Sequence, residues 1–150
     1  MVLEEERVAK LRPGREMVLL VEDEADVRTL TCEFLKVAGY QVLTAADGEE
    51  GFDTGQRFGD EIDILVTDVV MPRLRGPELA KRLRQLQPDL KVVYMSGYTE
   101  EFSEVPNLLQ GAYFLQKPFS RDALLRQIQD ALKGKPAEQA DRPAFSLRIT

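Results

Sequence analysis

The sequence predicts one α/β domain, built on a five-stranded parallel sheet that is doubly wound, with helices on both faces. Three observations predict it. Five short apolar runs are continuous, as in strands that are buried on both faces. Segments with helical periodicity follow these runs, so that strand and helix alternate in a (βα)5 pattern. A length of 150 residues is enough for a single domain with a core of its own.

The expected strands are recognised by their uninterrupted apolar character. In chain order they are Met17–Val21, Gln41–Ala45, Ile62–Thr67, Lys91–Met95 and Ala112–Leu115. Pro72 follows the central run and excludes its further extension as an inner strand.

The first two helices are predicted by apolar spacing and by end signals. Apolar residues recur at helical spacing from Ala25 to Ala38, and Gly39 suits the position after a helix end. Asp47 with Glu50 three residues later resembles a capping box, which opens a second helix that reaches about Arg57. The side chains expected to face inward from the first helix are Val27, Leu30, Phe34, Leu35 and Ala38.

Proline, glycine and serine mark the later helices. Gly76-Pro77 opens the third helix, since proline is tolerated in a first turn, and Pro88 ends it. Residues 100–110 are expected to form a weak helix because Pro106 interrupts them, and Ser120 caps the last helix. The expected buried stripes are Leu79, Leu83 and Leu86 in the third helix, and Leu124, Leu125, Ile128 and Leu132 in the last.

Composition limits the cellular setting and the partners. We expect residues 1–16 to be an N-terminal leader or linker, 17–133 the domain, and 134–150 a C-terminal tail. The net charge of −6 disfavours direct nucleic-acid binding. Cys32 has no second cysteine to pair with, which fits a reducing cytoplasm. No apolar run is long enough for direct membrane insertion, so the expected location is cytoplasmic.

The chain has no histidine. This excludes Ser-His-Asp and Cys-His catalysis and His-based zinc sites within the chain. Any phosphohistidine chemistry must therefore use a histidine from another molecule or from another part of a longer protein.

Acidic residues gather where two of the predicted strands end. Glu22 and Asp23 follow the first strand, and Asp68 follows the third. In a parallel sheet the ligand site lies beyond the carboxyl ends of the strands. Three crowded carboxylates repel one another, and a hard divalent cation such as Mg²⁺ relieves that repulsion. Each acid alone would more often be a surface or capping residue, but together they predict a metal site.

Asp68 is the candidate nucleophile of this site. A carboxylate can accept a phosphoryl group to give an aspartyl phosphate. Lys117 can neutralise one phosphoryl oxygen and the Ser96 hydroxyl can donate to another, while Gly97 leaves room for the incoming group.

These residues resemble the receiver domain of two-component response regulators. The matching segments are Leu19-Leu20-Val21-Glu22-Asp23-Glu24, Thr67-Asp68-Val69-Val70-Met71-Pro72 with Gly76, Met95-Ser96-Gly97-Tyr98 and Phe114-Leu115-Gln116-Lys117-Pro118-Phe119. The resemblance covers about residues 17–133 and implies a flavodoxin-like, CheY-like three-layer sandwich. It also implies a phosphoprotein that acts in a phosphorelay.

The resemblance implies roles for the acidic residues. Asp68 would accept phosphate from a phosphohistidine. Asp23 and Asp68 would ligate Mg²⁺ directly, with the backbone carbonyl of Val70 as the third protein ligand. Glu22 would act largely through metal-bound water; it replaces the more frequent aspartate, which lengthens one arm of the site.

The resemblance also implies roles on the last two strands. Ser96 and Lys117 would contact the phosphoryl group, and the peptide bond before Pro118 would be cis. Phe114 stands where the family keeps a switch aromatic, with plain core packing as the alternative. Pro106 lies in the family's usual output helix, which puts a switch on that face in doubt.

The residues of these motifs are most similar to those of receivers at the C-terminal end of hybrid sensor histidine kinases. A stand-alone single-domain response regulator and a pseudo-receiver binding module that is never phosphorylated stay open as alternatives. The implied partner is a histidine kinase or a histidine phosphotransfer protein, and the expected state is a monomer or weak dimer. We expect no conventional enzyme, only self-catalysed phosphotransfer and slow autodephosphorylation, because Val70 and Tyr98 flank the acceptor.

Two other classes fit less well. A haloacid-dehalogenase-type hydrolase also uses an aspartyl phosphate, but it needs a second aspartate where Val70 stands. A Rossmann domain would carry Gly-x-Gly-x-x-Gly after its first strand, and that motif is missing. The expected recognition surface is the outer side of the first helix together with the loops around the site, unless that side of the helix is merely solvated. Its residues are Arg28, Thr29, Cys32, Glu33 and Lys36.

Overall fold

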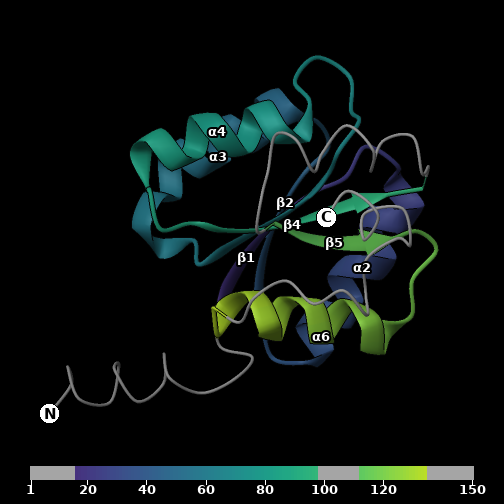
Figure 1. The fold of residues 1–150 in the computed structure, drawn as a ribbon. Coiled ribbons are helices and arrows are strands. Elements are labelled where there is room, and N and C mark those ends of the chain that lie inside the picture. Colours follow the sequence, from purple (N-terminus) through teal and green to yellow (C-terminus); the bar gives the residue numbers. More distant parts are fainter. Residues whose placement is uncertain (1–15, 98–111, 135–150) are drawn as a thin grey trace, which may run out of the picture.

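The computed structural model describes residues 16–97 and 112–134 (Figure 1). The expectations for the leader, for the weak helix at 100–110, for Tyr98 and for the C-terminal tail lie outside these residues. Within the described ranges, no helix has both the length and the apolar character that crossing a bilayer requires.

The five predicted strands form one parallel sheet with the order β2-β1-β3-β4-β5. Their bounds are β1 Met17–Val21, β2 Gln41–Ala45, β3 Ile64–Asp68, β4 Lys91–Ser96 and β5 Tyr113–Gln116. This confirms the predicted fold class. The third strand starts two residues later than predicted and includes Asp68 itself, because Asp68 pairs with Met95 of β4.

Helices cover both faces of the sheet, which gives three layers (Figure 1). The pair α3 and α4 packs on one face, and α2 and α6 pack on the other. Their bounds are α2 Ala25–Val37, α3 Gly48–Phe58, α4 Gly76–Leu86 and α6 Arg121–Leu132, with a 3₁₀ turn at Gly59–Glu61. Each helix pair encloses an apolar core cluster against its side of the sheet.

The predicted helix starts are confirmed by their hydrogen bonds. The Asp47 carboxylate accepts from the Glu50 N–H at 2.8 Å, and the Glu50 carboxylate accepts from the Ala46 N–H at 3.0 Å. The Ser120 hydroxyl accepts from the Ala123 N–H at 3.0 Å at the start of α6. These bonds satisfy N–H groups that no preceding turn can reach.

Two of the predicted buried positions are wrong. Leu30 is 52% exposed and Leu86 is 56% exposed. The buried residues of α2 are Thr31 and Leu35, so this helix is rotated relative to the stripe that the sequence suggested. The same rotation leaves Cys32 half-buried against the core and not on the outer side. Leu86 is the last residue of α4, one turn beyond Leu83.

Candidate functional site

The strand order brings the two acidic segments together. β1 and β3 are neighbours, with Val21 opposite Thr67, so their carboxyl ends lie side by side. Glu22, Asp23 and Asp68 each offer a carboxylate oxygen, and these oxygens lie within 4.8 Å of one another. The predicted acidic cluster is therefore present at the carboxyl edge of the sheet.

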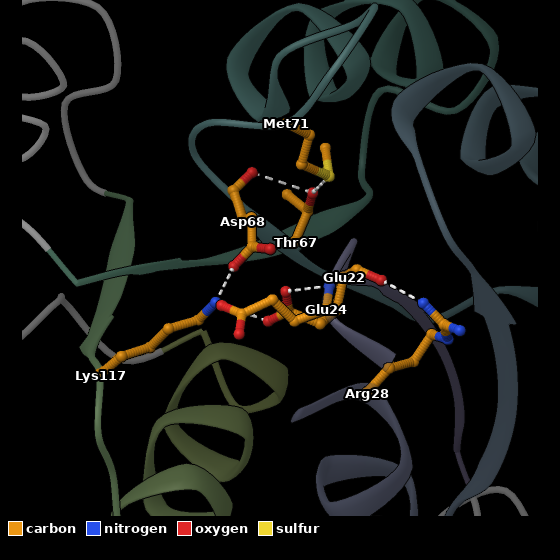
Figure 2. Close-up of polar contacts among 7 residues, drawn as sticks. All are labelled: Glu22, Glu24, Arg28, Thr67, Asp68, Met71 and Lys117. Atoms are coloured by element: carbon orange, nitrogen blue, oxygen red, sulfur yellow. Dashed lines mark hydrogen bonds and ion pairs between the residues drawn. The ribbon is translucent and has the colours of Figure 1, made fainter. Parts of the chain in front are cut away.

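Lys117 reaches this cluster from the far side of β4. Its backbone N–H donates to the Ser96 carbonyl at 2.8 Å, which places it where β5 ends. Its Nζ lies 2.6 Å from Glu22 Oε1 and 2.7 Å from Asp68 Oδ1, so a single ammonium bridges two carboxylates. Figure 2 shows the Lys117 side chain directed at Asp68. The peptide bond from Lys117 to Pro118 is cis.

Burial sets the charge state of the acids. Glu22 is fully buried and Asp68 is 4% exposed. Burial and the neighbouring Glu22 raise the pKa of Asp68 to about 9, against the opposing effect of Lys117. Burial alone would raise the pKa of Glu22 as well, but Asp68 and Lys117 hold that pKa below its usual value. At neutral pH the pair therefore retains one proton.

The Lys117 ammonium is stabilised in turn. Burial would lower the pKa of Lys117, but the carboxylates of Asp68 and Glu22 outweigh burial and raise it. Lys117 is therefore charged throughout the physiological range.

The donor set fits a hard cation. When both carboxyl groups are ionised, the buried Oδ2 of Asp68 has no hydrogen-bond donor among the described residues. A buried polar atom without a partner is costly, and a bound cation would remove that cost. Asp23 is exposed beside it and adds a second carboxylate. Oxygen ligands of this kind, at a site with solvent access, match the preference of Mg²⁺.

The loop after β3 is held close to the backbone of Asp68. The Thr67 hydroxyl donates to the Asp68 carbonyl at 3.1 Å, and the Gly76 N–H donates to the Val69 carbonyl at 2.9 Å. A Cβ atom at position 76 would lie 2.1 Å from the Asp68 carbonyl oxygen. Only glycine fits there, and this close approach fixes the turn that carries Val70. Val70 is 45% exposed and lines the cavity beside the site.

The residues assigned to the last two strands are buried next to the cluster. Ser96 is 2% exposed and ends β4, the strand adjacent to Asp68. Phe114 is 6% exposed and packs against Tyr94 with ring centroids 5.9 Å apart. Phe114 therefore packs in the core, which was the alternative prediction for it. Its role as a switch stays a prediction.

A cavity of about 590 Å³ opens from the acidic cluster along α2. Its apolar wall, which α2 shares with the segment after β5, was not predicted from the sequence. The lining residues beyond the predicted site are Glu24, Val27, Leu30, Thr31, Phe34, Met95 and Phe119. The exposed Leu30 is part of this wall.

Arg28 is the residue whose place the sequence did not predict. Its guanidinium donates to the backbone carbonyl of Glu22 at 2.8 Å, as Figure 2 shows. From the sequence, Arg28 was expected on the outer side of its helix as a recognition residue. The available signal was its position in the first turn of a helix, where the macrodipole disfavours a cation.

Comparison with known proteins gives one consistent result. A family model described as the response regulator receiver domain matches residues 18–129. The sensor kinase CckA from Brucella abortus (strain 2308) is 42% identical over 122 residues, which are 80% of this chain and 13% of that protein. The response regulator receiver protein CpdR from the same strain is 33% identical over 119 residues, 77% of this chain and 95% of that protein.

A solved structure agrees with the sequence matches. The crystal structure of the receiver domain from the hybrid histidine kinase CckA has a TM-score of 0.67 and 35% sequence identity. The similarity covers 77% of this chain and 98% of that domain.

Proposed function

Because the chain belongs to the response regulator receiver domain family of two-component signalling, we propose that Asp68 is its phosphoacceptor. One observation carries the proposal. Asp68 Oδ1 is paired with Lys117, while Oδ2 has no hydrogen-bond donor among the described residues when both carboxyl groups are ionised. Asp68 also lines the 590 Å³ cavity, so a phosphoryl donor has a route to it.

The proposed step is transfer from a phosphohistidine. A carboxylate oxygen of Asp68 attacks phosphorus, an O–P bond forms, and the P–N bond to the donor imidazole breaks. The electron pair of that bond stays on the imidazole nitrogen, and the acceptor becomes an aspartyl phosphate. Since the chain contains no histidine, the donor is a different protein or a different part of a longer one.

The surrounding residues hold charge and geometry for this step. Lys117 already pairs with Asp68, and the same ammonium can pair with the oxygens of the transferred phosphoryl group. Ser96 lies at the neighbouring strand end, where its hydroxyl can donate to another oxygen. Glu22, Asp23, Asp68 and the Val70 carbonyl would hold Mg²⁺. When bound, Mg²⁺ would favour the ionised carboxylate of Asp68 and offset negative charge on the phosphoryl group.

We propose a cytoplasmic histidine kinase or histidine phosphotransfer protein as the partner. The 42% identity to the receiver part of CckA supports the context of a hybrid kinase. The coverage of 95% of CpdR supports the alternative of a single-domain regulator. Both contexts use the same chemistry at Asp68.

Acetyl phosphate tests the acceptor directly. Incubation with Mg²⁺ should add the mass of one phosphoryl group, and Asp68→Asn should abolish the product in intact-mass spectrometry. Asp53→Asn, on the exposed side of α3, is the matched control and should be modified like the wild type. Modification that persists in Asp68→Asn, or none in the wild type with Mg²⁺, would reject the proposal and favour a pseudo-receiver.

A further inference from the structure

Arg28 makes a contact that reaches the site through the backbone. Its Nη1 lies 2.8 Å from the carbonyl oxygen of Glu22 (Figure 2). The residue stands in the first turn of α2, where a cation opposes the helix macrodipole. The N-cap residue of this helix, Glu24, makes no side-chain capping bond. A cation at this end of a weakly capped helix is unfavourable unless another contact compensates for it.

The contact completes the fixation of Glu22. The N–H of Glu22 donates to the Ala45 carbonyl at 3.1 Å, which extends the sheet by one residue. Its carboxylate accepts from the Glu24 N–H at 3.0 Å and pairs with Lys117 at 2.6 Å. The remaining polar group is the carbonyl oxygen, and Arg28 is its donor.

That carbonyl belongs to the peptide unit that joins Glu22 to Asp23. A peptide unit is planar, so a bond that fixes its C=O direction also fixes the direction of the N–H of Asp23 and the position of its Cα atom. Asp23 is exposed at the rim of the cluster, whereas the other two acids are held by burial. The orientation of Asp23 therefore depends on its backbone.

We propose that Arg28 is a positioning residue for the cation site: through the Glu22 carbonyl it holds the Glu22–Asp23 peptide so that Asp23 faces Asp68. The inference deepens the proposed function and rests on it, because it assigns the geometry of the same Mg²⁺ site. Hydrogen bonds that orient metal ligands from outside are known to change metal affinity by 10- to 100-fold.

A purely electrostatic role makes the opposite prediction. The guanidinium is a positive charge near three carboxylates, and it repels an incoming cation. If charge alone mattered, removing it would strengthen Mg²⁺ binding. If Arg28 positions the loop, removing it weakens binding.

The test measures the Mg²⁺ dissociation constant of the whole chain by titration calorimetry, well below the unfolding temperature. Arg28→Met should raise the Kd about tenfold, and Arg28→Lys, which keeps a charged donor, should recover to within about threefold of the wild type. Arg57→Met removes the same charge on α3 and should leave the Kd within about twofold of the wild type. A Kd for Arg28→Met that is unchanged or lower overturns the proposal.

Two further measurements keep the result decisive. If Arg28→Met does not fold, Arg28→Gln decides: a Kd at least about threefold higher supports positioning, and an unchanged Kd overturns it. Asp23→Asn distinguishes a failure of the proposed metal site from a failure of the proposed role of Arg28. If the wild type binds no Mg²⁺ and Asp23→Asn changes nothing, the proposed metal site fails, and the role of Arg28 fails with it. If Asp23→Asn weakens binding but Arg28→Met does not, only the positioning role is rejected.

Discussion

Replacing the acceptor by its neutral isostere should stabilise the metal-free protein. In Asp68→Asn the shape of the side chain is kept, and the group can no longer ionise. The folded state holds the pKa of Asp68 at about 9, whereas the ordinary value is 3.8. At pH 7 the unfolded chain therefore carries an ionised aspartate, and the folded chain must take up a proton.

The size of this effect follows from the pKa difference. Each pH unit between 3.8 and 7 adds about 1.36 kcal/mol, which gives about 4 kcal/mol of destabilisation at pH 7. Asparagine does not titrate, so it removes this penalty. Because Lys117 and Glu22 can rearrange around an ionised Asp68, we expect a net gain of about 1 to 4 kcal/mol.

The sign depends on pH in a definite way. The pKa is raised on folding, so the penalty is absent below pH 3.8, where both states are protonated, and it grows as pH rises toward 9. Urea unfolding in EDTA at pH 7 should show the gain, and the same measurement near pH 4 should show almost none. Asp53→Asn controls for the loss of one acid at an exposed position.

Mg²⁺ provides the second arm of the test. Saturating Mg²⁺ should stabilise the wild type through binding to the folded state, and should do so much less in Asp68→Asn. The gain should therefore shrink or reverse. A variant that is no more stable than the wild type at pH 7 in EDTA would refute the reasoning that burial and Glu22 suppress the ionisation of Asp68.

Mg²⁺ affinity, the loop after β3 and the buried Tyr94 hydroxyl each give one further prediction. Mg²⁺ binding at pH 7 should release a proton from Asp68, so the affinity for Mg²⁺ should rise by up to about tenfold per pH unit toward pH 9. A Kd for Mg²⁺ that calorimetry finds constant from pH 7 to about 8.5 contradicts this. Gly76→Ala should lower the free energy of unfolding in urea by about 3 kcal/mol or more, because the alanine Cβ would lie 2.1 Å from the Asp68 carbonyl oxygen. An unchanged urea midpoint would show that the loop can move. Tyr94→Phe should leave the stability unchanged or raise it by about 1 kcal/mol, since the buried Tyr94 hydroxyl has no hydrogen-bond partner among the described residues. A large loss of stability would show that the hydroxyl has a hydrogen-bond partner.

Much of the fold was predictable because its signals are local. Continuous apolar runs identified the strands, and capping residues such as Asp47 and Ser120 identified helix starts, since both depend on residues a few positions apart. The helical stripe of α2 was predicted less well. Leu30 and Phe34 fit a helical period as well as Leu35 does, and only packing against the sheet selected Thr31 and Leu35 as the buried side.

The sequence by itself determined which groups the site contains: the acids at the ends of the first and third strands, the serine at the end of the fourth and the lysine after the fifth. Only the tertiary structure decided how they meet. The strand order sets β3 between β1 and β4, and it lets the ammonium of Lys117, which follows β5, reach across β4 to two carboxylates. The full burial of Glu22, the raised pKa of Asp68 and the bond from Arg28 all depend on these long-range neighbours. Desolvation and charge act through space, so residue spacing along the chain does not encode their strength.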